Sequence, residues 1–245
     1  MRTGIIVQAR MTSTRLPGKV LMPVLGKPLL EYQIERLRRV GNSQEIIVAT
    51  TTNVTDQPIV DLCRRLEVKM FRGPEEDVLT RYYEAAEENA LDIVVRITSD
   101  CPLIDPNVVE RVITFFLEYA GNYDYVSNSL QGTYPQGMDT EVFSYKALSE
   151  AYREAARQME REHVTPFFYL NPRRYCLGNV MYKEDQSRHR WTVDTLEDFK
   201  LVAKIIEYFY PLNPCFTLED ILKLLNKNPD WFAINAHIKQ KKLFD

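Results

Sequence analysis

Three cations lie in a single predicted loop near the start of the chain. Residues 8–19 read QARMTSTRLPGK and place Arg10, Arg15 and Lys19 directly after an apolar run at residues 4–7. Guanidinium groups match phosphate oxygens with two parallel hydrogen bonds, and small hydroxyl residues add neutral donors. The loop lacks both glycine fingerprints of phosphate-binding loops, GxGxxG and GxxxxGK[ST]. We favour a site for a phosphorylated ligand over a solvated basic loop.

An acidic residue follows a second apolar run. The segment RITSDCPLIDP, residues 96–106, places Asp100 just beyond a predicted buried strand. Ligands of doubly wound sheets bind at the carboxyl ends of the strands. A carboxylate there would repel a phosphorylated ligand unless a cation such as Mg²⁺ lay between them. We favour metal binding by Asp100 over an exposed loop acid, whereas Asp105 before Pro106 is better explained as a helix cap.

The tetrapeptide TLED occurs twice, at residues 195–198 and 217–220, each time before a helical apolar pattern. Threonine followed by an acid three residues later forms a capping box, so the repeat itself marks helix starts. The first copy differs because Asp194 precedes it, after a predicted strand at 190–193. Asp194 is therefore expected to meet Asp100 at the same sheet edge, where the two form a candidate Mg²⁺ pair.

A further pair of acids lies in the segment GMDTEVF. In an extended chain Asp139 and Glu141 project to the same side. They are suited to accept hydrogen bonds from sugar hydroxyls. They are equally suited to the solvated face of an edge strand, and the sequence leaves both interpretations open.

Alternating patterns predict the elements that position these residues. The fold class is α/β, a doubly wound, mostly parallel sheet with helices on both faces, in a single domain of residues 1–245. A loop and strand at about 123–144 are expected as an insertion over the sheet. Strands are predicted at 4–7, 45–50, 68–71, 92–97, 123–127, 140–143, 175–181 and 190–193. Helices are predicted at 29–40, 56–66, 75–89, 106–120, 145–157, 160–170, 195–210 and 217–226.

Composition excludes several classes of protein. The 245 residues carry a net charge of −3, so the basic loop is a local device for a small ligand, and no nucleic-acid binding is expected. The 4 cysteines form no CxxC pair, which argues against zinc or disulfides and suits a reducing cytoplasm. Apolar runs fall short of the ~20 residues that span a bilayer, so we expect a cytoplasmic protein without membrane insertion. No serine or cysteine hydrolase signature accompanies the 3 histidines.

Five segments together resemble a known family. QARMTSTRLPGKVL, RITSDCPLIDP, GMDTEVF, REHVTPFFYLNP and RWTVDTLEDF follow in this order. They are similar to the spore coat polysaccharide biosynthesis branch of the sugar cytidylyltransferases. More distantly, they are similar to the enzymes that make CMP-activated Kdo and sialic acid. The resemblance covers nearly the whole chain and is most specific in the first and last segments.

The resemblance implies a fold like that of the nucleotide-diphospho-sugar transferases. It also implies a reaction in which a sugar or sugar acid attacks the α-phosphate of a nucleoside triphosphate and pyrophosphate leaves, in surface polysaccharide or glycan synthesis. Mg²⁺ is the implied cofactor, and a homodimer is the family expectation. Carried onto this sequence, the nucleotide-binding residues are Gln8, Ala9, Arg10, Ser13, Arg15 and Lys19. The catalytic residues are Arg10, Arg15, Lys19 and Asp100, the metal ligands are Asp100 and Asp194, and the sugar-binding residues are Asp139 and Glu141.

Two departures from the family pattern limit what can be carried over. Ser99 stands where glycine commonly precedes the aspartate, and serine is small enough to keep the backbone path. The segment RGPEEDVLTRYYEAA differs from the corresponding segment of the Kdo enzymes near their nucleotide and sugar site. Base and sugar preferences therefore cannot be carried over from those enzymes. Cytosine is the family default, and guanine stays open. The alternatives to a cytidylyltransferase are a glycosyltransferase of similar fold and a non-catalytic sugar-nucleotide-binding assembly protein.

Overall fold

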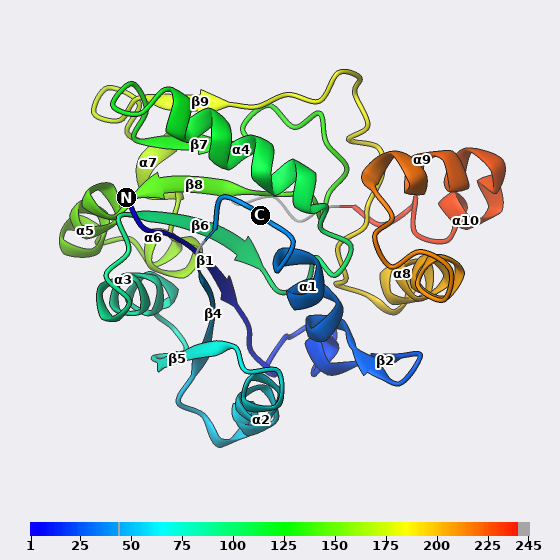
Figure 1. Ribbon diagram of the computed structural model, residues 1–245. Coiled ribbons are helices and arrows are strands. Elements are labelled where there is room, and N and C mark those ends of the chain that lie inside the picture. The colour runs from blue at the N-terminus through cyan, green and yellow to red at the C-terminus, as the bar shows by residue number, and fades with distance from the viewer. Residues whose placement is uncertain (44, 240–245) are drawn as a thin grey trace.

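A seven-stranded sheet forms the centre of the protein (Figure 1). The computed structural model describes residues 1–43 and 45–239. The strand order is β5-β4-β1-β6-β8-β7-β9, and of these seven strands β8 alone is antiparallel to its neighbours. The predicted fold class, a mostly parallel sheet, is confirmed. The strands are β1 (Thr3–Gln8), β4 (Glu45–Thr51), β5 (Lys69–Gly73), β6 (Ile93–Thr98), β7 (Tyr125–Ser127), β8 (Glu141–Ser144) and β9 (Leu177–Asn179).

Helices cover both faces of this sheet, as Figure 1 shows. One face carries α1 (Leu29–Leu37), α2 (Gln57–Arg65) and α4 (Pro106–Glu118). The other carries α3 (Val78–Glu88), α5 (Tyr145–Glu154), α6 (Gln158–His163) and α7 (Pro166–Tyr169). A third group, α8 (Leu196–Phe209), α9 (Leu218–Lys227) and α10 (Pro229–Ala233), lies beside α1. Short elements follow the first loop and β4, namely η1 (Lys19–Leu21), β2 (Pro23–Val24), β3 (Lys27–Pro28) and η2 (Val54–Asp56).

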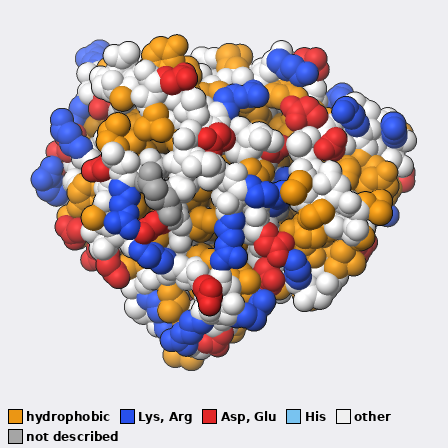
Figure 2. All heavy atoms as spheres, viewed as in Figure 1, with side chains coloured by type: hydrophobic (Ala, Val, Ile, Leu, Met, Phe, Trp, Pro, Cys, Tyr) orange, Lys and Arg blue, Asp and Glu red, His pale blue; other side chains and the backbone are white. Residues whose placement is uncertain are grey.

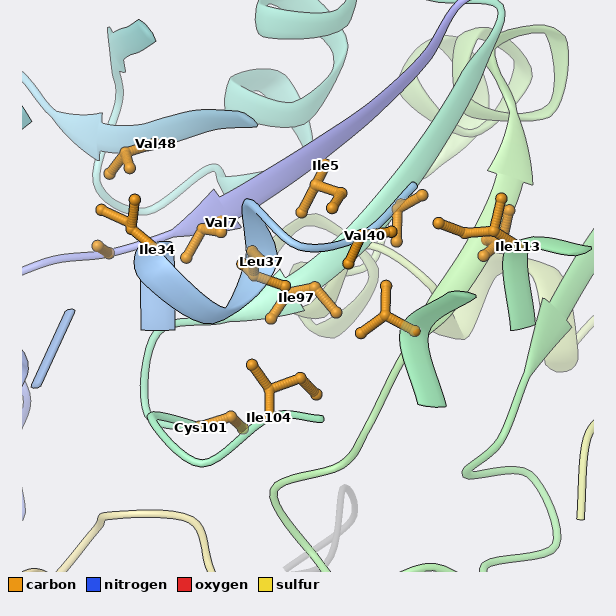
Figure 3. Packing of buried hydrophobic residues seen from close by; sticks show 14 of the residues in the cluster. Ile5, Val7, Ile34, Leu37, Val40, Val48, Ile97, Cys101, Ile104 and Ile113 are labelled. Carbon is orange, nitrogen blue, oxygen red and sulfur yellow. The ribbon is translucent and has the colours of Figure 1, made fainter. Parts of the chain in front are cut away.

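The period of two along β1 explains the layers. Ile5 and Val7 point into the core beneath α1, where Figure 3 shows them near Ile34 and Leu37. Ile6, between them, joins the core on the opposite face. Because residues 4–7 of this strand are covered by helices on one side or the other, they form a continuous apolar run.

A third core joins the C-terminal helices to α1. Tyr32 of α1 and Trp191 are buried with residues of α8 and α9. Arg36 of α1 crosses this boundary, because its guanidinium donates to the backbone oxygens of Ile104, at 2.6 Å, and Phe216, at 2.9 Å. The C-terminal helices are therefore packed onto the sheet domain as part of one structure.

Three of the expected elements differ from the structure. The strands within 123–144 do not lie over the sheet, because β8 is inserted between β6 and β7. Residues 190–193 form no strand and make a single bridge to Gln136, which lies in a loop and offers no ladder. The helix expected at 160–170 breaks at Val164, with φ 69, before a proline that cannot continue the backbone hydrogen bonding.

Within residues 1–43 and 45–239, no helix is long and apolar enough to cross a membrane. On the face shown in Figure 2, lysine and arginine side chains are interspersed with aspartate and glutamate. Such a mixture of positive and negative side chains is expected for a protein with a net charge of −3.

Candidate active site

The loop between β1 and η1 is anchored at both ends. Gly18 N donates to Met11 O at 2.9 Å, which closes the loop on itself. Met11 N donates to Oδ1 of Asp56 at 2.8 Å, and this fully buried carboxylate also accepts from Thr50 and Thr51 at the end of β4. The loop that carries the cations is thus held at the carboxyl ends of the parallel strands.

Lys19 connects two carboxylates from distant parts of the chain. Its Nζ lies 2.7 Å from Oδ1 of Asp194 and 3.2 Å from Oδ2 of Asp100. The side chain reaches inward because Gly18, with φ 71, turns the backbone immediately before it. Lys19 is 8% exposed, so both ion pairs are shielded from solvent. The predicted meeting of Asp100 and Asp194 is therefore observed, with Lys19 between them.

Asp194 arrives at this place without a preceding strand. Val193 N donates to the backbone oxygen of Asp100 at 2.8 Å, and Oγ1 of Thr192 contacts the same oxygen at 3.3 Å. These hydrogen bonds attach an extended loop to the end of β6. The expected position of Asp194 is correct, although the expected strand at 190–193 is wrong.

Asp194 also contacts two arginines. Arg15 lies 2.8 Å from its Oδ1, and Arg190 lies 2.7 Å from its Oδ2. Arg190 in turn donates through Nε to the fully buried Asp198 at 2.9 Å. Sequence reasoning assigned Asp198 only to a capping box and did not select Arg190. The spacing of four residues between Arg190, Asp194 and Asp198 was the available signal.

The cluster controls the protonation of its members. Burial disfavours the charge on Lys19, but Asp100 and Asp194 outweigh it and raise the pKa of Lys19 above its ordinary value. Burial likewise opposes the charge on Asp100, and Lys19 holds the pKa of Asp100 below its usual range. Ion pairs therefore keep these groups charged despite their burial.

Arg10 lies outside this cluster. Its guanidinium is 3.3 Å from Oε1 of Glu75, a carboxylate that also accepts from Thr12 and Asn53. The hydrogen bond from Thr12 is the main cause that lowers the pKa of Glu75. Glu75 belongs to the segment that departs from the Kdo enzymes, and sequence reasoning gave it no role. The structure thus brings Arg15 and Lys19 together but holds Arg10 at a second, adjoining position on the loop.

The remaining predicted nucleotide residues line the start of the same loop. Ala9 is buried, and its N–H donates to Ala49 O of β4 at 3.1 Å. Gln8 accepts at its backbone oxygen from Ser99 N at 3.2 Å, so serine keeps the backbone path here. The side-chain Oε1 of Gln8 is buried and has no hydrogen-bond partner among the described residues. That oxygen can accept a hydrogen bond from a ligand. Ser13 lies farther along the loop and is half-buried.

Asp139 and Glu141 differ in their surroundings. Glu141 is buried within β8, forms an ion pair with Arg96, and accepts from Tyr125 Oη at 2.6 Å. Because β8 lies inside the sheet, a solvated edge strand is excluded for this pair. Asp139 is half-buried just before β8 and accepts from Gly137 N at 3.2 Å. Asp139 is therefore the more accessible of the two predicted sugar-binding residues.

The donor set at the sheet edge fits Mg²⁺. One ammonium, Lys19 Nζ, contacts both Asp100 and Asp194, so a single cation at that place reaches both carboxylates. In the part of the chain that the structure describes, no three metal-ligating side chains converge. Two carboxylates are nevertheless the usual protein contribution to Mg²⁺, because substrate phosphates and water supply the other ligands.

Comparison with known proteins identifies relatives over nearly the full chain. Residues 4–244 match the family model described as cytidylyltransferase. An uncharacterized protein of Methanocaldococcus jannaschii is 38% identical over 238 residues, 96% of this chain and 95% of that protein. The spore coat polysaccharide biosynthesis protein SpsF of Bacillus subtilis is 31% identical over 235 residues, 92% of this chain and 94% of that protein. The solved structure of a cytidylyltransferase from Leptospira borgpetersenii has a TM-score of 0.92 at 32% identity and covers 99% of this chain and 100% of that one.

The mostly parallel sheet, the charged loop at its edge and these relatives define an enzyme of the nucleotidyltransferase class. Within that class, the chain belongs to the cytidylyltransferase family. The resemblance seen in the sequence motifs is thereby confirmed.

Proposed function

We propose that this enzyme transfers CMP from CTP to a sugar or sugar acid, with release of pyrophosphate, in the synthesis of a surface polysaccharide or glycan. One observation carries the proposal. Lys19 and Arg15 meet Asp100 and Asp194 in a single cluster at the carboxyl ends of the parallel strands. This is the place where doubly wound folds bind nucleotides.

The charge balance of the cluster supports a triphosphate together with a divalent cation. Three cations, Arg15, Lys19 and Arg190, face three carboxylates, Asp100, Asp194 and Asp198. Phosphate oxygens would compete for Arg15 and Lys19, and would leave Asp100 without Lys19 and Asp194 paired with Arg190 alone. These two carboxylates would then hold Mg²⁺, which when bound neutralises phosphate charge and polarises the phosphoryl group under attack.

The residues have separate roles in this proposal. Arg15 and Lys19 bind and orient the triphosphate, and Lys19 stabilises charge that develops as pyrophosphate leaves. Arg10 and Ser13, in the adjoining part of the loop, also bind the triphosphate. The free side-chain oxygen of Gln8 suits a donor group on the nucleotide, such as the exocyclic amine of cytosine. The family description supports CTP as the nucleotide, and the relative named SpsF supports the polysaccharide context.

A substrate panel tests the proposal. The purified enzyme is incubated with each nucleoside triphosphate and a series of sugars and sugar acids, with and without Mg²⁺, and released pyrophosphate is measured. We expect release with CTP and one class of acceptor, and loss of release when EDTA removes the metal. Binding of nucleotide without release for any pair would favour an assembly protein. Transfer of sugar from a sugar nucleotide would favour a glycosyltransferase.

The Asp100→Asn variant gives the sharper test of the metal site. Among the described residues Asp100 has one ion pair, to Lys19, so the amide should leave the fold intact while pyrophosphate release falls by about 10²-fold or more. Asp194 is less suitable, because Asp194→Asn also weakens the ion pairs with Arg15 and Arg190. A normal rate for Asp100→Asn at low Mg²⁺ concentration would show that the proposed metal site is wrong.

A further inference from the structure

Asp139 differs from the other acidic side chains around the site. Asp100 and Asp194 contact Lys19, Glu75 contacts Arg10, and Glu141 contacts Arg96. Across residues 1–43 and 45–239, Asp139 has no ion pair, and its one hydrogen bond comes from the backbone N–H of Gly137. A carboxylate that is not paired with a cation lacks the nearby positive charge that would lower its pKa.

The backbone on both sides of Asp139 is fixed by one buried side chain. Nδ2 of Asn128 donates to Met138 O at 2.7 Å, and Oδ1 of Asn128 accepts from Thr140 N at 2.8 Å. Asn128 is 1% exposed, so these hydrogen bonds are protected from water. Asp139 is thus held in one position, whereas its side chain stays half-buried and accessible.

Residues 191–193 contact both the turn that precedes Asp139 and the backbone of Asp100. Gly137 adopts φ +100 and approaches the backbone of Trp191 so closely that a Cβ atom would lie 2.8 Å from its carbonyl carbon. The next two residues, Thr192 and Val193, contact the backbone oxygen of Asp100. Residues 191–193 therefore bring Asp139 to the edge where Asp100 and Lys19 lie.

The surroundings of Asp139 raise its pKa. Burial raises the pKa of Asp139 to about 6, the charges of Glu141 and Asp100 act in the same direction, and Arg96 and the N–H of Gly137 act against them. The pKa of the neighbouring Cys101 thiol is also raised, because burial and the charges of Asp100 and Asp139 disfavour the thiolate. At neutral pH, Asp139 is therefore mostly ionised but close to the pKa that suits a general base.

We propose that Asp139 is the general base that accepts the proton of the acceptor hydroxyl; this inference rests on the proposed function. The hydroxyl oxygen forms a bond to the α-phosphorus of CTP as the bond between that phosphorus and the bridging oxygen breaks. Pyrophosphate takes the electron pair of the broken bond, and the hydroxyl proton passes to Asp139. The balance needs no other reactant, and the proton is lost to water after the products leave.

The Asp139→Asn variant tests this role, because the amide keeps the shape and a hydrogen-bond acceptor but takes up no proton. We expect kcat to fall by about 10² to 10⁴-fold. The KM for the acceptor should stay within about threefold, since the hydroxyl can still be bound. In the wild type, kcat/KM should rise with pH up to about 6 and then level off, and the variant should lack this limb. Asp185→Asn, at an exposed acid, is the matched control and should behave as the wild type.

Two kinetic results would overturn the proposal. One is a kcat for Asp139→Asn within about threefold of the wild type. The other is a loss confined to the KM for the acceptor with an unchanged pH profile, which would mean that Asp139 only binds the sugar.

A measurement without substrate separates this inference from the proposed function. Carbon-13 NMR of the enzyme labelled at aspartate carboxyl groups follows the titration of Asp139, with Asp139→Asn used for assignment. A midpoint near 6 is expected, and titration at an ordinary aspartate pKa would overturn the inference whatever the activity. If Asp139 titrates near 6 but the wild type releases no pyrophosphate with any nucleotide, the proposed function fails, and the base role fails with it.

Discussion

Lys19 contacts both of the carboxylates that the proposed function assigns to the metal. Without substrate its ammonium lies between Asp100 and Asp194, at the place where a divalent cation would reach both carboxylates. In the proposed reaction, Lys19 turns to the triphosphate. In that proposal, Lys19 neutralises the half-buried Asp100 and the buried Asp194 until nucleotide and metal bind.

This exchange predicts the behaviour of Lys19→Met at the residue scale. Removing the ammonium leaves two facing carboxylates, so Mn²⁺, used as a probe, should bind at least about tenfold more tightly in the absence of nucleotide. Electron paramagnetic resonance of free Mn²⁺ measures this affinity. Turnover should fall by about 10² to 10³-fold, because a donor to the triphosphate is lost.

Lys27→Met is the matched control for this experiment. Lys27 also forms an ion pair, with Glu35 at 2.6 Å, but it lies in β3 away from the two carboxylates. Its removal should change neither Mn²⁺ binding nor turnover. Equal Mn²⁺ affinities for Lys19→Met and the wild type would contradict the exchange.

At the scale of elements, the two TLED segments form a natural comparison. Thr195 and Asp198 begin α8, Thr217 and Asp220 begin α9, and both pairs make complete capping boxes. Asp198 alone of the two acids is fully buried, where it accepts from Arg190 at 2.9 Å and from Asn235 at 2.8 Å. The same four-residue motif therefore has a purely local role in α9 and a tertiary role in α8.

The pair predicts unequal losses of stability. Asp198→Asn leaves Arg190 buried with one carboxylate fewer, and should lower the free energy of unfolding by about 3 to 5 kcal/mol. Asp220→Asn removes only cap interactions and should cost about 1 kcal/mol. Urea unfolding at pH 7 measures both values. Similar losses would show that Arg190 does not depend on Asp198.

At the scale of the whole molecule, His189 makes stability depend on pH. It is buried where α10 and the segment 186–192 meet, and neither ring nitrogen has a hydrogen-bond partner among the described residues. Burial, with a smaller effect of Arg188, lowers the pKa of His189 from 6.5 to about 4. The folded protein therefore binds this proton less readily than the unfolded chain.

As the pH falls from 6.5 to 4, His189 is protonated in the unfolded chain but not in the folded protein, so stability decreases by up to about 3 kcal/mol. Below pH 4 the contribution becomes constant. His189→Phe should remove this part of the slope in unfolding experiments across that range, whereas His237→Gln, at an exposed histidine, should keep it. A slope unchanged in His189→Phe would contradict the assignment.

Local sequence patterns predicted much of the fold. The apolar run that forms β1, the cap at Asp105 and both capping boxes each depend on residues within a few positions of one another. The order of cations and acids along the chain also indicated the charged loop and the pairing of Asp100 with Asp194. These features could be predicted because strand periodicity and helix capping are set by neighbouring residues.

Tertiary structure decided the remaining features, because they depend on groups that are distant in sequence. The insertion of β8 inside the sheet buries Glu141 against Arg96, and Asp139, just before β8, forms no ion pair with any residue that the structure describes. The attachment of Val193 to Asp100 brings Asp194 to the site without a strand. The sequence alone thus determined which residues carry charge and which segments are helical or extended. Only the packed chain determined which charges neutralise one another, because ion pairing depends on distances of a few ångströms between segments about a hundred residues apart.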